Sequence, residues 1–558
     1  MDAILEKTQY LFPKEAAEVA ERIRSLIKKW KLRIRYSYPA LDQRDSVLIT
    51  YGDSILDGKI PPLAALNRFL EEVAGDCISA IHLLPMFPYT SDDGFSVVNF
   101  REVDPALGDW EDIKQLRERY DLMFDCVVNH ASGKSRYIEG YKKGEKPYDQ
   151  FFIRCDPTLD YSMVTRPRTL PLLTGFETAR GIEYLWTTFS ADQVDFDFRN
   201  PDVLLEILDI LLMYAERGAR FFRFDAACYL WKELGTNCIN LPQTHEIIKL
   251  IRLVMDECVT GMNIITETNV PHEENITYFG NGHDEAGLVY QFPLPPLVLY
   301  SFLKHDTSNL TQWLQNLEPT TSDTAFFNYL ASHDGIGLRP VENILPAEEV
   351  AWMVDKAKER GARVNYRTTA DGSPSPYELN ITYLDAVAGD ETSAERIARK
   401  FLASQCVLLS LAGIPGIYIH SLLGARNDYR AVEESGINRR INRSKLEYKQ
   451  LLKELEDTDS LRGQILTGYR NMLRVRCTQE SFSPRSPQHV MSCDPRLIAL
   501  KRGEGDHMIC VYINVSAETV VLDALPGVDL LSGRSVGKSI RIGPYEYMWI
   551  RENKEEFV

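Results

Sequence analysis

Three acidic residues stand directly after short apolar runs of the chain. Asp225 follows ARFFRF, Glu267 follows NIIT, and Asp334 follows AFFNYLASH. A carboxylate and a carboxylic acid about 5 to 5.5 Å apart can cleave a glycosidic bond with retention, one as nucleophile and the other as proton donor. Asp225 suits the nucleophile, because Arg223 on the same strand face would keep it ionised, whereas Glu267 has no adjacent cation and suits the acid/base. Taken alone, the Arg223–Asp225 pair favours a buried structural ion pair.

These three acids can act together only in a fold that brings the ends of several strands to the same edge. Apolar runs of strand length alternate with helical stretches such as 201–217, 243–259 and 394–411. This pattern predicts an α/β protein built on a (β/α)8 TIM barrel, whose strands end in an active-site cup. Short apolar runs are also typical of buried helix segments. The eight runs span 46–52, 80–85, 121–130, 219–227, 263–269, 287–292, 325–334 and 413–420.

The 558 residues are too many for one compact core, so we expect additional parts around the barrel. Residues 1–45 indicate a helical extension, and 480–558 indicate a small antiparallel β-domain. Two stretches are too long for barrel loops, and both would hang over the C-terminal mouth. The second of them contains a helical segment and the polar loop TTADGSPSPYE. The predicted domains are the extension 1–45, the barrel 46–130, 198–335 and 394–479, the inserted domains 131–197 and 336–393, and the β-domain 480–558.

Charge and composition exclude several classes of function. The net charge of −17 argues against nucleic acid and against an anionic membrane surface as partners. No apolar run approaches the roughly 20 residues needed to span a bilayer, and the first thirty residues indicate a charged helix pair rather than a signal peptide. The ten cysteines are scattered without metal-site spacing. We therefore expect a cytoplasmic protein with reduced thiols and with neither metal nor cofactor.

Four segments, DCVVNH (125–130), GARFFRFDAA (218–227), TETN (266–269) and ASHDG (331–335), resemble the four ordered motifs of the α-amylase family, glycoside hydrolase family 13. The resemblance implies that Asp225 is the nucleophile, Glu267 the general acid/base, and Asp334 a third carboxylate that clasps sugar hydroxyls. It also implies that His130 and His333 are paired imidazoles at the glucosyl subsite. On its own, His130 is equally typical of a hydrogen-bonded structural histidine.

Other stretches resemble the sucrose phosphorylase branch of that family. After FDAA an amylase usually carries Lys-His, whereas Cys228-Tyr229 stand here, so a long polymer subsite is not expected. The resemblance implies that Asp92 and Arg443 clamp the glucose 4-hydroxyl and make the donor pocket blind-ended. Ser96 departs from the branch, which tends to have Asp there. The wall would be completed by Phe95, Phe189 and Gln193, aromatic and polar residues that core packing would also explain. The matching stretches are 83–100, 166–174, 185–201, 232–238, 294–300 and 425–443.

Within the branch, residues 266–300, ASHDGIGLRP and SPYELNITYLDA resemble the glucosylglycerate phosphorylases. This implies conversion of 2-O-α-D-glucosyl-D-glycerate and phosphate into α-D-glucose 1-phosphate and D-glycerate, by double displacement through a β-glucosyl-Asp enzyme. Phosphate and glycerate are both anions, so the acceptor side needs cations. Arg168 is the first candidate and Lys232 and Arg339 follow, although Arg339 fits a surface salt bridge equally well. The sequence leaves a homodimer open.

Three rival functions remain on sequence alone. A sucrose or sucrose 6-phosphate phosphorylase would share the donor half and differ at the acceptor. A small-substrate α-glucosidase or transglucosidase would differ in how well it excludes water. A catalytically inactive barrel acting as a binding or scaffold subunit is disfavoured by the intact Asp225, Glu267 and Asp334.

Overall fold

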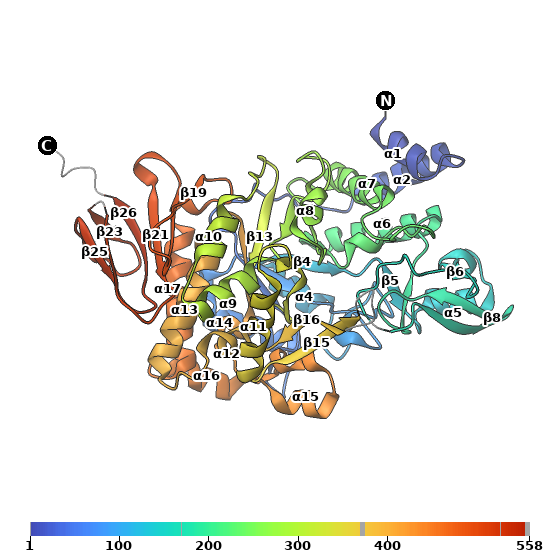
Figure 1. Ribbon diagram of the computed structural model, residues 1–558. Helices are drawn as coiled ribbons and strands as arrows, with labels where there is room; N and C mark the ends of the chain where they lie inside the picture. The colour runs from blue at the N-terminus through green and yellow to red at the C-terminus, as the bar shows by residue number, and fades with distance from the viewer. Residues whose placement is uncertain (1, 169, 369–373, 525, 553–558) are drawn as a thin grey trace.

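The computed structural model describes residues 2–168, 170–368, 374–524 and 526–552. At its centre, eight parallel strands close into a barrel in chain order (Figure 1). Each of the eight predicted runs holds one of these strands, which confirms the (β/α)8 prediction. The strands are β1 (Val47–Thr50), β3 (Ala80–Leu83), β4 (Asp121–Cys126), β10 (Ala219–Phe224), β11 (Asn263–Thr266), β12 (Leu288–Tyr290), β13 (Ala325–Tyr329) and β17 (Ile414–Tyr418).

Strand β10 shows how side-chain alternation builds the barrel. The Phe222 ring lies 6.5 Å, centroid to centroid, from Tyr214 of the covering helix α6 (Pro201–Glu216). Arg223, its neighbour, contacts Asp125 of β4 instead. Since successive strand residues point to opposite faces, one set packs under the helices and the other lines the interior. The other main helices around the barrel are α3 (Pro62–Val73), α4 (Trp110–Arg117), α7 (Pro242–Cys258), α9 (Leu294–Lys304), α10 (Ser308–Gln315), α13 (Ala394–Ser410) and α17 (Leu461–Cys477).

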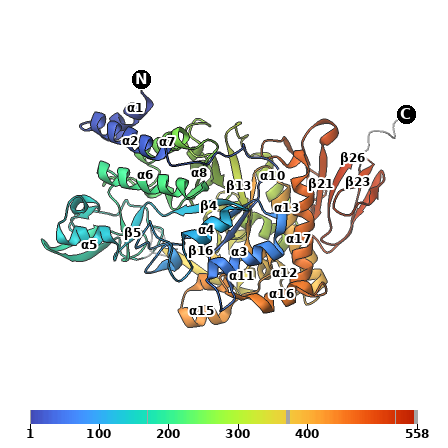
Figure 2. The same cartoon turned by 180° about the vertical axis from the view of Figure 1, so that it is seen from behind.

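Two N-terminal helices, α1 (Ala3–Leu11) and α2 (Ala16–Lys31), lie against the outer side of α6 and α7 (Figure 2). Trp30 is buried and donates from Nε1 to Asp209 of α6 at 2.8 Å. Lys7 pairs with Glu246 of α7 at 3.0 Å. The apolar face of the pair is thus buried on the barrel's helical shell.

The chain between β4 and α6 forms two small antiparallel sheets, β5–β9 and β6–β8–β7. Its elements are β5 (His130–Ser132), α5 (Arg136–Lys143), β6 (Arg154–Cys155), β7 (Leu173–Thr178), β8 (Gly181–Trp186) and β9 (Gln193–Asp195).

A second excursion, between β13 and α13, forms an antiparallel sheet in the order β14–β16–β15. Its elements are β14 (Ile336–Gly337), α11 (Ala347–Glu359), β15 (Arg363–Thr368), β16 (Pro374–Asn380) and α12 (Tyr383–Ala388). The polar loop predicted over 368–378 is wrong in its second half, because 374–378 form strand β16, paired antiparallel with β15. Residues 369–373 of that predicted loop lie outside the described residues.

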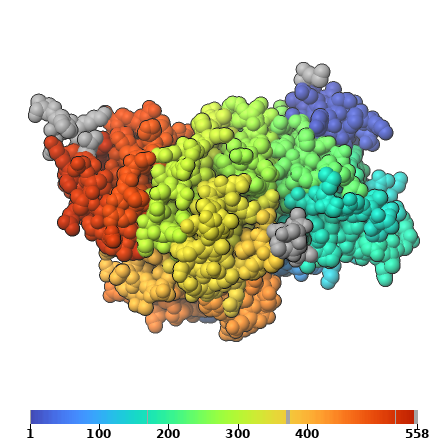
Figure 3. All heavy atoms as spheres, viewed as in Figure 1, coloured from blue at the N-terminus to red at the C-terminus, as the bar shows by residue number. Residues whose placement is uncertain are grey.

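The C-terminal residues form a six-stranded sheet in the order β19–β20–β21–β26–β23–β24, with a separate β22–β25 pair. Its pairings are antiparallel, as predicted. Trp549 of this domain donates to Ser410 of α13 at 2.9 Å, which anchors the sheet to the barrel. The domain lies at the end of the molecule opposite the first excursion (Figure 3). The strands are β19 (Gln488–Val490), β20 (Leu497–Arg502), β21 (Ile509–Asn514), β22 (Val520–Asp523), β23 (Gly527–Asp529), β24 (Ser535–Val536), β25 (Ser539–Ile542) and β26 (Tyr547–Glu552).

Across the described residues, no helix combines the length and the apolar character that crossing a membrane requires.

Candidate active site

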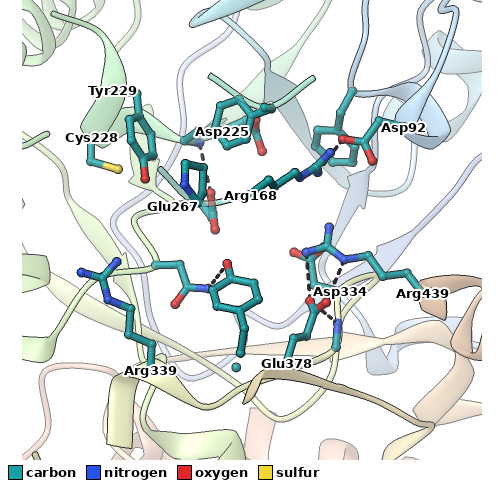
Figure 4. A pocket seen from close by; sticks show the side chains of 18 of the residues that line it. Asp92, Arg168, Asp225, Cys228, Tyr229, Glu267, Asp334, Arg339, Glu378 and Arg439 are labelled. Atoms are coloured by element: carbon teal, nitrogen blue, oxygen red, sulfur yellow. Dashed lines mark hydrogen bonds and ion pairs between the residues drawn. The ribbon is translucent and has the colours of Figure 1, made fainter. Parts of the chain in front are cut away.

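A cavity of about 210 Å³ lies where the barrel strands end and the two excursions meet. Figure 4 shows Asp225 and Glu267 between Asp92 on one side and Arg339 on the other. Arg223, Lys232 and Arg443 do not line it. The predicted site residues that do line it are Asp92, Phe95, His130, Arg168, Phe189, Gln193, Asp225, Glu267, His333, Asp334 and Arg339.

The ends of β10 and β11 place two of the acids side by side. Phe224 is in register with Thr266, so Asp225 and Glu267 are the next residue on each strand. The Glu267 N–H donates to the Phe224 carbonyl at 3.0 Å, and the Ala226 N–H donates to Glu267 Oε2 at 3.0 Å. Backbone hydrogen bonds therefore hold the Glu267 side chain against the turn that carries Asp225.

The Arg223 guanidinium joins both acids from below. It lies 2.7 Å from Asp225 and 3.8 Å from Glu267, and it also contacts Asp125 at 2.5 Å. The Asp125 carboxylate in turn accepts from His82 Nε2 at 2.7 Å. The buried ion pair that the sequence predicted is therefore part of the active site. Through it, Arg223 orients Asp225 and Glu267 at the rim of the barrel.

Burial and the neighbouring charges shift the pKa values of the three acids differently. Burial raises the pKa of Glu267 to about 7, and the nearby Asp225 and Asp334 add to that rise while Arg223 opposes it. Burial also raises the pKa of Asp225, but Arg223 at 2.7 Å opposes the shift. Burial would raise the pKa of Asp334 too, yet Arg439 and its neighbours lower it below its ordinary value. A carboxyl group with a pKa near neutrality, as Glu267 has, suits a proton donor at physiological pH.

The two histidines are held differently. His130 Nε2 lies 2.8 Å from the Phe95 carbonyl, and its Nδ1 lies 3.2 Å from the Asn129 amide nitrogen, so both ring nitrogens have partners inside the protein. His333 stacks on the Phe95 ring with centroids 5.0 Å apart. Burial lowers the pKa of His333 to about 3, so its imidazole is neutral at physiological pH.

Arg168 does not stand free but reaches the end of the cavity that holds Asp92 (Figure 4). Its guanidinium donates to Asp92 at 2.8 Å and lies over the Phe189 ring, 5.8 Å from the centroid. Gln193 Nε2 donates to the same Asp92 carboxylate at 3.2 Å.

Arg443 is not brought to Asp92 as predicted. It pairs with Asp93 at 2.7 Å, behind the cavity wall. The cavity is lined instead by Arg439, which lies 2.7 Å from Asp334 and 2.9 Å from Glu378. Both arginines end an INR triplet in GINRRINR, so the sequence offered Arg439 four residues earlier. Glu378 gave no sequence signal, because it arrives on the unpredicted strand β16.

Several known proteins are similar to this chain over most of its length. The model of the α-amylase catalytic domain matches residues 70–337. A glucosylglycerate phosphorylase of Allomeiothermus silvanus is 45% identical over 98% of this chain and 98% of its own length. A glucosylglycerate phosphorylase of Spirochaeta thermophila is 43% identical over 100% of this chain and 99% of its own length.

The chain belongs to the α-amylase family.

A solved structure shares the fold of this chain. The crystal structure of sucrose 6F-phosphate phosphorylase from Thermoanaerobacter thermosaccharolyticum aligns with a TM-score of 0.74 and 26% identity. The alignment covers 85% of this chain and 94% of that one. The TIM barrel and the recognition of the family are therefore confirmed.

The cavity lining also carries Arg339, the third of the cations predicted for the site. Arg339 lies half-buried at the cavity, and none of the described residues forms a hydrogen bond or ion pair with its guanidinium. Asn269 lies on the same lining, donates to the Tyr377 hydroxyl at 3.2 Å, and leaves its buried Oδ1 without a partner. The salt-bridge reading of Arg339 is thus not what the structure shows.

The prediction that Lys232 binds the acceptor is wrong, because its side chain is buried under the first excursion. Its ammonium lies 2.6 Å from Asp195 and donates to Asn129 Oδ1 at 2.7 Å. Since Asn129 also contacts His130, Lys232 supports the site from beneath. Among the described residues, no cluster of His, Cys, Asp and Glu could hold a metal ion.

Replacing Lys232 with Met should therefore destabilise the protein rather than alter its acceptor. The change leaves the fully buried Asp195 carboxylate without its ammonium partner. The free energy of unfolding should fall by about 3 to 5 kcal/mol. Urea unfolding followed by tryptophan fluorescence measures it. The double variant Lys232→Met, Asp195→Leu, which removes both charges, should recover part of the loss. An unchanged midpoint in the single variant would contradict the buried pair.

Proposed function

We propose that this protein is a retaining glycoside phosphorylase that converts 2-O-α-D-glucosyl-D-glycerate and phosphate into α-D-glucose 1-phosphate and D-glycerate. The observation that supports the chemistry is that one guanidinium, Arg223, lies 2.7 Å from Asp225 and 3.8 Å from Glu267, whose pKa burial raises to about 7. The substrate follows from relatives at 43% and 45% identity over nearly the whole chain, which are named glucosylglycerate phosphorylases.

The first half of the proposed reaction cleaves the donor. Glu267 gives its proton to the glycosidic oxygen while Asp225 attacks the anomeric carbon from the opposite side. Glycerate leaves, and the glucosyl group is held as a β-ester of Asp225. Arg223 orients the Asp225 carboxylate for the attack, since it contacts one of the two oxygens.

The second half exchanges glycerate for phosphate. A phosphate oxygen attacks the same carbon, releases Asp225 and restores the α-configuration. The incoming phosphate monoanion returns its proton to Glu267, so the acid begins the next cycle protonated. Phosphate is nucleophilic without strong base assistance, which favours it over water.

We further propose roles for the residues around the sugar. The glucosyl group would lie between Asp225 and the end of the cavity marked by Asp92, against Phe95 and the neutral His333. Phe189, His130 and Gln193 would complete the pocket. Arg439 takes the place that the sequence interpretation gave to Arg443, because it contacts Asp334 inside the cavity.

Arg339 is proposed as the cation that holds the acceptor's carboxylate. A guanidinium without a protein partner can bind a carboxylate in bidentate fashion, and Asn269 Oδ1 can accept from an acceptor hydroxyl. Arg168, committed to Asp92 here, would have to exchange that partner to reach phosphate. Glycerate, with one carboxylate and two hydroxyls, fits the Arg339–Asn269 side better than a neutral sugar does.

Replacing Arg339 with Ala should lower kcat/KM for D-glycerate about 10- to 100-fold, the worth of a charge-assisted hydrogen bond of about 1.5 to 3 kcal/mol. Activity with the neutral acceptor glycerol should change little. Arg367→Ala is the matched control, because Arg367 lines the same cavity but is paired with Glu342 at 2.6 Å. Equal losses with glycerate and glycerol would refute a carboxylate role for Arg339.

An acceptor panel tests the function as a whole. The protein is incubated with α-glucose 1-phosphate and, separately, D-glycerate, fructose, fructose 6-phosphate or glycerol, and phosphate release is followed. D-glycerate should give the fastest release. Fastest release with fructose or fructose 6-phosphate would favour the sucrose-type rivals, release without acceptor would indicate a hydrolase, and no release would indicate an inactive barrel.

We also infer a cytoplasmic location, where thiols stay reduced, because the ten described cysteines form no disulfide. A homodimer also remains a proposal. Light scattering in solution would measure the oligomeric state.

A further inference from the structure

Inside the barrel, a line of polar side chains runs from strand β3 to the nucleophile at the end of β10. His82 of β3 is 1% exposed and lies in register with Met123 of β4. Met123 stands two residues before Asp125, so His82 and Asp125 face the same interior in successive layers. Asp125 is in register with Arg223 of β10, and Asp225 follows Arg223 by two residues at the rim. The line therefore passes through successive layers of the barrel towards the active site.

Short hydrogen bonds connect the members of this line. Asp125 Oδ2 accepts from His82 Nε2 at 2.7 Å, and Asp125 Oδ1 accepts from Arg223 Nη1 at 2.5 Å. The same Nη1 donates to Asp225 Oδ1 at 2.7 Å. One nitrogen of Arg223 therefore serves both carboxylates, with one of its two hydrogens on each.

The second ring nitrogen of His82 indicates which nitrogen carries the proton. His82 Nδ1 is buried and has no hydrogen-bond partner among the described residues. A proton on Nδ1 would be a buried donor without an acceptor, which costs about 1 to 3 kcal/mol. This favours a neutral ring whose one proton is on Nε2, where Asp125 accepts it.

The hydrogen bond from His82 limits how Asp125 can bind Arg223. In the part of the chain that the structure describes, the Asp125 carboxylate accepts from His82 on one oxygen and from Arg223 on the other. Without His82, Oδ2 would be a buried acceptor with no partner, and carboxylates bind guanidinium groups most strongly through two parallel hydrogen bonds. Asp125 would then draw the guanidinium towards β4 and away from Asp225.

Such a movement would change the position of the nucleophile. Arg223 holds Asp225 Oδ1, which leaves Oδ2 to form the bond to the anomeric carbon. A displacement of about 1 Å at a reacting group can lower the rate by about 10²-fold.

We propose that His82 is a positioning residue for Asp225 and that it acts through Asp125 and Arg223. The proposal rests on the part of the proposed function in which Asp225 is the nucleophile. In this role the His82 N–H keeps Asp125 at a single hydrogen bond to Arg223. The second hydrogen of Nη1 then remains on Asp225.

The charges around Asp225 determine the sign of the expected pH effect. Burial raises the pKa of Asp225 and Arg223 opposes that rise, so a weaker contact with Arg223 should raise this pKa further. Since Asp225 must be ionised to attack, activity should then be lost at a higher pH as the solution is acidified. The groups that face Asp225 are Arg223 of β10, Asp125 of β4, His130 of β5, Glu267 after β11 and Asp334 after β13.

The test measures fluoride release from α-glucosyl fluoride in the presence of phosphate. Fluoride leaves without a proton from Glu267, so the acid limb of kcat/KM reports on Asp225. His82→Phe keeps a ring but removes the N–H. It should lower kcat/KM for the fluoride about 10- to 100-fold and move the acid limb up by about one pH unit. KM for D-glycerate, measured with α-glucose 1-phosphate, should stay within about twofold.

Two further substitutions of His82 make the test specific. His82→Gln places an amide N–H near the position of Nε2, so it should recover most of the rate and return the acid limb to that of the unmodified enzyme. His82→Asn places its amide near Nδ1 instead, so it should behave as His82→Phe does. Thermal unfolding followed by circular dichroism shows whether each variant is folded at the assay temperature.

His420→Phe is the matched control. His420 is 3% exposed, its Nε2 lies 2.7 Å from the Ser444 carbonyl oxygen, and its Nδ1 also has no partner among the described residues. The change therefore removes a similar buried imidazole that is not connected to Asp125. It should leave the acid limb where it is in the unmodified enzyme.

The outcomes separate this proposal from the proposed function. A loss of rate in the Phe and Asn variants of His82 with an unmoved acid limb would show a structural effect and would overturn the proposal. The same shift in His420→Phe would also overturn it. If the unmodified enzyme does not use D-glycerate, the proposed function fails, while fluoride release still tests His82. An unmodified enzyme that releases no fluoride would defeat both.

Discussion

Replacing Asp225 with Asn is expected to abolish turnover, with a loss of about 10⁴-fold or more in kcat for glucosylglycerate phosphorolysis. The amide cannot form the ester with the anomeric carbon, and Arg223 at 2.7 Å loses its charged partner. Initial rates of glucose 1-phosphate formation measure the effect. Because a second buried acid, Asp125, still pairs with Arg223, the variant should remain folded.

Covalent trapping distinguishes loss of the nucleophile from general damage. A slow fluorinated glucosyl fluoride should label the unmodified enzyme on the peptide that contains Asp225, as read by mass spectrometry. Asp225→Ala supplied with azide and α-glucosyl fluoride should make β-glucosyl azide, the product of a single displacement. A label on another carboxylate, or most of the activity surviving in Asp225→Asn, would refute the assignment.

Replacing Glu267 with Gln is expected to slow glucosylglycerate cleavage about 10²- to 10⁴-fold, because the glycerate oxygen then leaves without a proton. Fluoride needs no proton to leave and phosphate needs little base, so synthesis of glucose 1-phosphate from α-glucosyl fluoride should be largely retained. Equal losses with the two donors would contradict a role in proton transfer. Cys228→Ser is a suitable control, since Cys228 lines the cavity beside Glu267.

The pH profile should carry the signature of the same residue. Glu267 must be protonated to act as the acid, and its pKa is about 7 in the free protein. Values of kcat/KM for glucosylglycerate should therefore fall as pH rises through about 7. With α-glucosyl fluoride, whose fluoride leaves without a proton, the unmodified enzyme should lack this alkaline limb, and a limb that persisted would belong to another group.

The parts of the site that the sequence predicted are those fixed by strand geometry. Asp225, Glu267 and Asp334 follow apolar runs, and parallel strands in a barrel bring such positions to one rim. Alternation along β10 likewise predicted that Arg223 faces the interior with Asp225. Local patterns were sufficient here because the backbone alone determines where these side chains point.

The parts that were missed depend on loops and on competition between partners. Lys232 and Arg168 are cations of the expected kind, but they pair with the buried Asp195 and the partly exposed Asp92, and neither partner is adjacent in the sequence. Arg439 and Arg443 end identical triplets, and only the path of the 3-10 turn η7 (Asn438–Asn442) decides which one enters the cavity. Which partner a cation takes, and which arginine enters the cavity, depends on how the two excursions pack together. The hydrophobic pattern of the sequence does not contain that information.

The docking of α1 and α2 has a practical consequence. They rest on α6 and α7, the helices that lead directly into β10 and β11, so they brace the two strands that end in Asp225 and Glu267. Shortened versions of the protein that begin after Lys31 would bare the apolar surface that Trp30 covers and would loosen the supports of both residues. Proteolytic removal of these helices should therefore first make the activity sensitive to heat, before the protein unfolds detectably.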